Sequence, residues 1–337
     1  MRLTSSAVDT SGPGAAQDWR AAPRRGTVRP MRTHALLLAT LVSLGCGFHN
    51  HPPVPMPARG PARDSLLELD QSRADSLDAH GAIDGMLSLL GTDVVFLRAG
   101  LPAVYGKAAT RAVFASGSDA VAPGTIWQPL GGRVSLDVNS GYTYGIVGRV
   151  AVGRSRGPAV RLERYIAFWQ RPPARPWRII AYAELNAPAS ADVPIAAEHA
   201  VPPALQLSGK AAEATASIRA ADSLFADLAD RMGVAYAFSN TVAETGVVVG
   251  QPRLAVGPDA VRELFDARPA GTSLTWRPAY AVVAGSLDLG FTVGETIFTG
   301  RGPSGAAVQR FGKYLRVWER QKDGTWKFVV DGANSNR

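Results

Sequence analysis

The chain has 337 residues, enough for about two domains that each enclose their own core. A hydrophobic content of 46% and a charged content of 19% are typical of globular domains. The net charge of +8 does not indicate a nucleic-acid partner, because residues 1–45 hold six Arg and two Asp (6 − 2 = +4) and the other +4 is scattered among acidic residues. The single cysteine excludes an intrachain disulfide and a cysteine-based metal site.

The N-terminal region has the pattern of a secretory signal. Met31 begins a short basic segment, residues 35–44 form an apolar run, and Cys46 follows a glycine. The run is too short to span a bilayer. The junction resembles that of bacterial lipoproteins, whose signal is removed before a cysteine that is then lipidated, although Ser43 departs from the Leu or Val usual at its position. Ordinary secretion with an incidental cysteine is the alternative.

The sequence before the first domain therefore predicts a targeting signal and a tether, and no folded domain. Residues 1–45 are interpreted as an upstream extension plus the signal, with Met31 as the true start. Residues 46–63 are Pro-rich and are predicted to form a semi-extended tether. We expect a bacterial cell-envelope protein that is lipid-anchored through Cys46 or secreted, with no membrane contact other than the anchor.

Two copies of one domain follow, at residues 64–186 and 215–337. Residues 187–214 are rich in Ala and Pro and are interpreted as a linker. The copies are aligned by collinear pairs: Asp70 with Asp222, Trp127 with Trp276, Tyr165 with Tyr314, Trp169 with Trp318, and Trp177 with Trp326.

Each copy is predicted to be helical first and to continue with strands. In the second copy, apolar residues recur every three or four positions from Ile218 to Met232, and Gly233 ends that helix. A second short helix, a short strand and a third helix opened by Pro258 come next. Four strands then follow, near residues 274–283, 287–299, 308–319 and 325–331, the last two joined by a turn at Asp323-Gly324. This order predicts an α+β domain with an antiparallel sheet covered by helices on one face.

The second copy ends in the pattern G-K-Y-x-x-x-W-x-x-x-x-D-G-x-W-K, residues 312–327. With the order of elements, this pattern resembles the nuclear-transport-factor-2-like (NTF2-like) superfamily, which includes ketosteroid isomerases and SnoaL-like cyclases, and within it a bacterial family without an assigned function. The first copy departs from the pattern, with residues 172–176 (PPARP) in place of Asp-Gly.

The resemblance implies two tandem cone-shaped domains, each a curved, mostly antiparallel sheet covered by about three helices and leaving a conical pocket. Members of the superfamily commonly pair sheet to sheet. A tandem chain is therefore expected to form such a pair within itself, as an intramolecular pseudo-dimer.

Motifs for common chemistries do not fit their contexts. Residues 300–305 match G-x-G-x-x-G formally, but they lie between two predicted strands and are interpreted as a turn. No two of the five His have metal-ligand spacing within a predicted domain, so neither zinc nor a histidine-activated nucleophile is expected. The sequence indicates no cofactor.

Candidate ligand-binding residues lie on the last two strands. Alternation places Tyr314 and Arg316 on one face. If that face points into the cone, they offer a hydroxyl and a cation to an anionic or carbonyl-bearing ligand, with Trp276 or Trp326 as an apolar wall. The alternative, which we favour for the tryptophans, is that they belong to the core; for Arg316 the alternative is a solvated edge residue.

Asp331 is the fourth ligand-binding candidate and a weak catalytic candidate, because a carboxyl group within an apolar strand can have a raised pKa and act as a general acid or base. A surface partner of Lys327 or a turn carboxylate is the more favoured interpretation. Strict alternation groups Phe328, Val330 and Gly332 on the face opposite Asp331.

The first copy has Ala167 and Tyr182 where the second has Arg316 and Asp331. A site is therefore expected in the second copy. The favoured hypothesis is a protein that binds a small, partly apolar ligand there without chemistry. The second is an acid/base enzyme of the ketosteroid-isomerase, cyclase or hydrolase type, and the third is a protein-interaction module.

Overall fold

The computed structural model of the chain describes residues 56–116, 126–151, 159–185, 209–250, 253–302 and 304–336. The predicted signal, Cys46, the first part of the tether and nearly all of the linker lie outside these residues. Among the described residues, no helix is both long enough and apolar enough to cross a bilayer.

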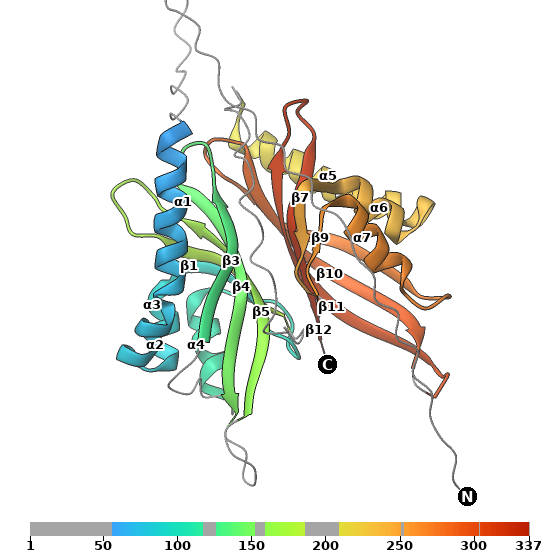
Figure 1. Cartoon of the computed structure of the whole chain (residues 1–337), viewed down its shortest axis with the longest axis horizontal. Coiled ribbons are helices and arrows are strands. Elements are labelled where there is room, and N and C mark those ends of the chain that lie inside the picture. Colours follow the sequence, from blue (N-terminus) through green and yellow to red (C-terminus); the bar gives the residue numbers. More distant parts are fainter. Residues whose placement is uncertain are drawn as a thin grey trace, which may run out of the picture. The chain divides into compact units, whose positions relative to one another are not determined.

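The first domain has helices on one face of a six-stranded sheet (Figure 1). The strands run in the order β2-β1-β6-β5-β4-β3, and β1 and β6 are parallel while the other neighbours are antiparallel. The elements are α1 (Met56–Gln71), α2 (Arg73–His80), α3 (Ala82–Leu89), β1 (Leu90–Leu97), β2 (Val104–Tyr105), α4 (Lys107–Ser116), β3 (Ile126–Val134), β4 (Ser140–Ala151), β5 (Ala159–Gln170) and β6 (Arg178–Leu185).

The second domain repeats this topology with the order β8-β7-β12-β11-β10-β9, in which β7 and β12 are the parallel pair. Its helices again cover one sheet face (Figure 1). The elements are α5 (Ala211–Met232), α6 (Val234–Thr241), β7 (Val242–Val248), β8 (Ala255–Val256), α7 (Gly257–Asp266), β9 (Ser273–Val283), β10 (Leu289–Arg301), β11 (Ala307–Arg320) and β12 (Trp326–Ser335). The predicted α+β class, with two helix-covered sheets, is confirmed.

Helix α5 shows why the repeat folds as it does. Ile218, Phe225 and Ala229 recur at helical spacing and are buried, so this stripe lies against the sheet. The helix ends where Gly233 takes a φ of 91°, a left-handed conformation that glycine adopts at little cost.

The helices of both domains begin earlier than the sequence indicates. Residues 56–63, predicted as part of the tether, form the first two turns of α1 instead. Arg59 in this segment is buried and donates a hydrogen bond to the Val134 carbonyl at 3.4 Å. Packing against β3 thus holds a Pro-containing segment in helical form. Residues 211–214, predicted as linker, form the first turn of α5.

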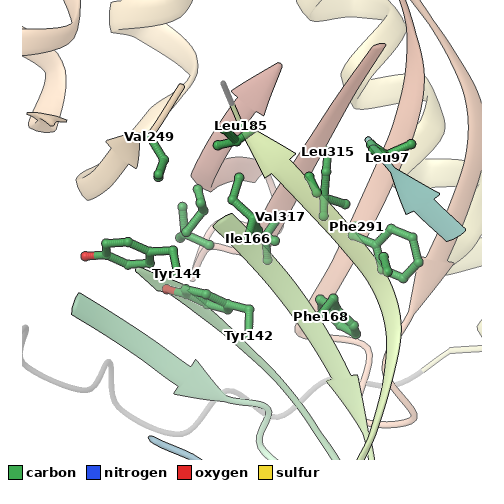
Figure 2. Packing of buried hydrophobic residues seen from close by; sticks show 14 of the residues in the cluster. Leu97, Tyr142, Tyr144, Ile166, Phe168, Leu185, Val249, Phe291, Leu315 and Val317 are labelled. Atoms are coloured by element: carbon green, nitrogen blue, oxygen red, sulfur yellow. The ribbon is translucent and has the colours of Figure 1, made fainter. Parts of the chain in front are cut away.

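The sheet faces that the helices do not cover share one buried hydrophobic cluster. Figure 2 shows Phe168 of β5 beside Phe291 of β10, and their ring centroids are 4.9 Å apart. Ile166 from the first sheet and Val317 from the second belong to the same cluster. The central part of each sheet is therefore buried on both faces, under helices on one side and against the other sheet on the other.

Polar contacts surround this cluster and cross between the domains. Arg133 forms an ion pair with Glu319, and both side chains are buried. Further hydrogen bonds between the domains run from the Leu136 N–H to Asp288 (3.0 Å) and from the Asn334 amide to the carbonyls of Leu97 (3.2 Å) and Glu184 (2.6 Å).

A β-bulge in β12 changes which side chains face the helices. Val317 pairs with Val330 and Trp318 pairs with Phe328, so Val329 is an extra residue. Phe328 consequently packs under the helices, while Val330 packs against the other sheet. The prediction that Phe328, Val330 and Gly332 share one face is wrong, because strict alternation assumes a strand without an inserted residue.

The bulge also positions the candidate carboxylate. Beyond Val329 the alternation is reversed, so Asp331 points toward the helices and pairs directly with Arg316 of β11. The first domain has the same irregularity, between Phe168 and Trp169, and it turns Tyr182 toward the helices.

Candidate functional site

A buried aspartate of α5 is the centre of the second domain. Asp222 has no exposed surface, and both of its carboxylate oxygens accept hydrogen bonds from the sheet. The donors are the Tyr314 hydroxyl (2.7 Å), Nη1 of Arg316 (2.5 Å) and Nε1 of Trp276 (3.1 Å). Asp222 therefore joins three of the four residues predicted to bind a ligand. Asp222 itself was not among the predicted site residues.

A signal for Asp222 was present in the sequence. It lies four residues after Ile218 and three before Phe225, on the apolar stripe that faces the sheet. An acidic residue at such a position must be buried, and a buried carboxylate requires a cation or several donors.

Arg316 is enclosed rather than solvated. Its side chain is 2% exposed, and its Nε donates to Asp331 at 2.8 Å. Aromatic rings surround the guanidinium, with centroids 4.5 Å away for Phe225 and 4.6 Å for Tyr314. Burial lowers the pKa of Arg316, but the charges of Asp331 and Asp222 outweigh burial and raise the pKa above its usual value. The edge-residue alternative is wrong.

Asp331 is likewise buried, with 5% of its surface exposed. Burial raises the pKa of its carboxyl group, and the adjacent Arg316 opposes that rise. Lys327, the surface partner considered for it, donates instead to the Asn240 carbonyl. Asp331 is thus a buried carboxyl group held by an arginine, and neither a surface nor a turn residue.

Tyr314 serves as a donor in this arrangement. Burial and the negative charge of Asp222 raise the pKa of its hydroxyl well above the usual value. The hydroxyl therefore keeps its proton at physiological pH and holds it toward Asp222.

The tryptophans belong to the core, as favoured from the sequence. Trp276, Trp318 and Trp326 are all buried in the cluster between the helices and the second sheet. Trp276 also borders a cavity, so one side of its ring remains available as an apolar wall.

This cavity of about 50 Å³ lies beside the network. Its floor is polar and buried, and its rim is partly exposed. A volume of this size holds one or two water molecules, whereas sites for drug-sized ligands measure about 300–1,000 Å³. The lining residues include the floor residues Trp276, Tyr314, Arg316 and Asp331 and the rim residues Gly250, Arg268, Leu274, Thr296 and Ala333.

The first domain builds its interior from the same carboxylate but a different arginine. Asp70 accepts hydrogen bonds from the Tyr165 hydroxyl (2.5 Å) and from Nη1 of Arg73 (2.8 Å). Arg73 belongs to α2, and its guanidinium lies 3.9 Å from the ring centroid of Trp127. Ala167 stands at the strand position that corresponds to Arg316. The cation thus comes from a helix in the first domain and from a strand in the second, and both domains have a polar core.

The two domains differ most at the position of the cavity. Glu184 of the first domain corresponds to Ala333 of the second. Glu184 pairs with Tyr165 across the strands, and Ala333 pairs in the same way with Tyr314, the counterpart of Tyr165. In the first domain Glu184 forms a buried ion pair with Arg98, at 2.8 Å.

The second domain also lacks an arginine that corresponds to Arg98, the other member of this ion pair. Arg98 follows the last residue of β1, and Gly250 is its counterpart after β7. Two long charged side chains thus occupy the region that a glycine and an alanine border in the second domain.

Within the described part of the chain, no three His, Cys, Asp or Glu side chains are grouped as ligands for a metal ion. The second site therefore offers a donor network, an arginine on its rim and apolar walls. This composition suits the binding of a small molecule with a polar end.

Comparisons with known proteins concern the fold. No protein-family model and no curated protein sequence matches the chain. A ketosteroid isomerase-like protein from Erwinia carotovora atroseptica is similar in structure, with 21% identity over 36% of this chain and 96% of that one, at a TM-score of 0.32.

Two further solved structures are similar over a comparable share of the chain. An NTF2-like protein with a cystatin-like fold from Novosphingobium aromaticivorans has 26% identity over 37% of this chain and 82% of that one, at a TM-score of 0.31. An NTF2-like superfamily protein from Salmonella enterica has 13% identity over 38% and 94%, at 0.32. Each of these likenesses spans 36–38% of this chain and concerns the fold alone.

Proposed function

We propose that the second domain binds a small, partly apolar ligand in the cavity beside Arg316, and that the first domain is its closed structural partner. One observation carries this proposal. The region that Arg98 and Glu184 fill in the first domain is bordered by Gly250 and Ala333 in the second. A polar floor and the apolar side chains of the wall then face a space that a ligand can occupy.

The cavity volume limits the ligand. About 50 Å³ accommodates only a few heavy atoms, so a larger molecule requires the rim to open. Arg268 and Leu274 are partly exposed rim side chains, and neither belongs to the buried network around Asp222, so an outward movement of these two would leave that network in place. The proposed ligand therefore lies partly inside the cavity and partly between the rim side chains.

Mass spectrometry of the natively purified protein tests this function. We expect a small molecule to accompany the wild-type chain and to be lost from Ala333→Glu, because the new side chain matches Glu184 and fills the cavity. Ser304→Glu is the control, since it adds the same charge to an exposed turn. Equal retention of the molecule by both variants would contradict a site in this cavity.

An acid/base enzyme is the second candidate, because Asp331 lines the cavity and burial raises its pKa. Its ion pair with Arg316 makes it a poorer proton acceptor than an unpaired carboxylate, so binding without chemistry ranks first. If turnover of a bound molecule is found, Asp331→Asn should abolish it, and circular dichroism should show that the variant is folded although it has lost the ion pair with Arg316. Unchanged turnover would exclude this role.

We also propose that the protein resides in a bacterial cell envelope, anchored by lipid on Cys46. The support is the basic segment, short apolar run and Gly-Cys junction of residues 31–46. Cys46→Ser should move the protein from the membrane fraction to the soluble fraction. Continued membrane association of this variant would refute anchoring through the cysteine.

Finally, we propose that the tandem domains act as an intramolecular pseudo-dimer with no requirement for a second chain. The shared cluster that contains Phe168 and Phe291 supports this, because it buries the sheet face of both domains. Size-exclusion chromatography with light scattering should give the mass of a monomer. An obligate dimer would contradict the proposal.

A further inference from the structure

We infer that the ligand of the second domain carries an anionic group, of the class of a carboxylate, that pairs with Arg268 on the cavity rim. This inference rests on the ligand site proposed above and specifies the chemistry of its ligand.

Arg268 is the charged group of the cavity for which the described residues supply no ion-pair partner. The guanidinium of Arg316 is held by Asp222 and Asp331, so the inner charges are already satisfied by one another. Among the described residues, no acidic side chain forms an ion pair with Arg268. Its backbone N–H bonds to the Phe265 carbonyl at 3.3 Å, which fixes the start of the side chain just after α7.

The position of the guanidinium suits a planar anion. It lies 4.4 Å from the ring centroid of Phe265, and a guanidinium that covers an aromatic face can direct its in-plane N–H donors elsewhere. Arginine can bind a carboxylate through two parallel hydrogen bonds of this kind. The Thr296 side chain on the same rim adds a hydroxyl group, and Leu274 adds apolar surface.

The energetics favour an anion at this place. Burial lowers the pKa of Arg268, and the charge of Asp331 opposes that effect without forming an ion pair. A partly buried cation without a counterion is costly, and an anionic ligand would offset that cost.

Asp331 sets a condition on the ligand, because it lines the same cavity and would repel a second carboxylate. The charged and titratable groups around it are Arg316, Arg268, Asp222 and Tyr314. Arrival of an anion favours the protonated form of Asp331, as for two carboxyl groups that share a site. Affinity for a carboxylate should consequently increase as the pH falls, until the ligand itself is protonated.

The experiment uses the full-length chain and three small carboxylates: acetate, isobutyrate and benzoate. Each is compared with its primary amide and with the amine of matching shape, and binding is followed through the indole N–H signal of Trp276 in NMR spectra. We expect at least one carboxylate to bind about tenfold or more tightly than its amide, and the amines not to bind. Arg268→Gln should remove this preference.

Arg262→Gln is the matched control, because Arg262 lies on α7 and pairs with Asp266 at the surface. It should keep the preference of the wild type. Equal affinity for carboxylates and amides would overturn the anion inference while leaving the ligand site intact. Binding of an amine alone would overturn it in favour of a cation. Failure of every probe would count against both the inference and the proposed site. Circular dichroism of both variants checks that they are folded.

Discussion

The two domains have the same topology and the same central aspartate, but their arginines come from different elements. In the first domain Arg73 of α2 pairs with Asp70, and in the second Arg316 of β11 pairs with Asp222. Phe225 occupies the helix position of Arg73, and Ala167 the strand position of Arg316. A buried carboxylate thus demands a cation nearby, but the fold does not dictate which element supplies it.

The change of position has consequences for the rest of each interior. Arg316 of β11 pairs with Asp331 of the neighbouring strand β12, so the second network extends to the cavity. The first domain has Tyr182 in place of Asp331, and Tyr182 stacks with Phe96, with ring centroids 5.7 Å apart. The interior of the first domain is thus an aromatic and ionic core, whereas the interior of the second domain has polar groups next to a cavity.

The largest expected effect comes from removing the central carboxylate of the second domain. Asp222→Ala leaves Arg316 with one counterion and leaves the Tyr314 and Trp276 donors without their acceptor. We expect a loss of about 3–5 kcal/mol in the free energy of unfolding, measured by urea denaturation. Asp227→Ala, an exposed position on the same helix, is the control. A loss below about 1 kcal/mol for Asp222→Ala would show that the network is not structural.

Exchanging the cation within the first domain tests the comparison directly. Arg73→Phe removes the counterion of buried Asp70, and Ala167→Arg adds a second buried cation; each change alone should cost about 2 kcal/mol or more. The double variant restores one cation for one carboxylate, as in the second domain. A double-mutant cycle should therefore give a favourable coupling of about 1–3 kcal/mol. Additive losses would mean that the two arrangements are not interchangeable.

A smaller effect is expected from Asp288, which lies at the contact between the domains. Burial raises the pKa of its carboxyl group to about 6, while hydrogen bonds from Ser286 and the Leu136 N–H oppose that rise. The native state therefore binds a proton more readily than the unfolded chain, so stability contributed by this group increases as the pH falls through 6 and is lost as the pH rises.

The charged groups around Asp288 are Arg59, Arg133 and Glu319, of which Arg59 favours its ionised form and Glu319 opposes it. Between pH 7.5 and pH 5, Asp288 should add about 1 kcal/mol to the free energy of unfolding. Asp288→Asn should remove the part of the pH dependence of the melting temperature that corresponds to this contribution of about 1 kcal/mol, so the profile between pH 7.5 and pH 5 should be flatter than that of the wild type. An unchanged pH profile would mean that another group controls it.

Much of the fold was predictable because the apolar residues of the second copy recur at helix spacing in its first helix and alternate with polar residues in its last strands. Gly233 marks the end of α5, and the Asp323-Gly324 turn marks the last hairpin. The start of α1 was not predictable, since proline and glycine favour an irregular segment and only packing of Arg59 against β3 reveals the helix.

The candidate site was predicted in part. Alternation correctly brought Tyr314 and Arg316 to one face, but it could not reveal the bulge at Val329 that turns Asp331 toward them. The role of Arg73 could not be predicted either. Arg73 lies on a helix and Arg316 on a strand, and no local sequence pattern indicates that the two arginines do the same thing in the two domains.

The NMR signals of two corresponding tryptophans test the central claim most directly. Trp276 borders the cavity of the second domain, and Trp127 holds the equivalent position beside Arg73 in the first. The indole N–H signals of both are followed while acetate, isobutyrate and benzoate and their amides are added to millimolar concentration. A ligand site restricted to the second domain predicts saturable movement of the Trp276 signal and none of the Trp127 signal. Equal movement of both signals, or of neither, would contradict it.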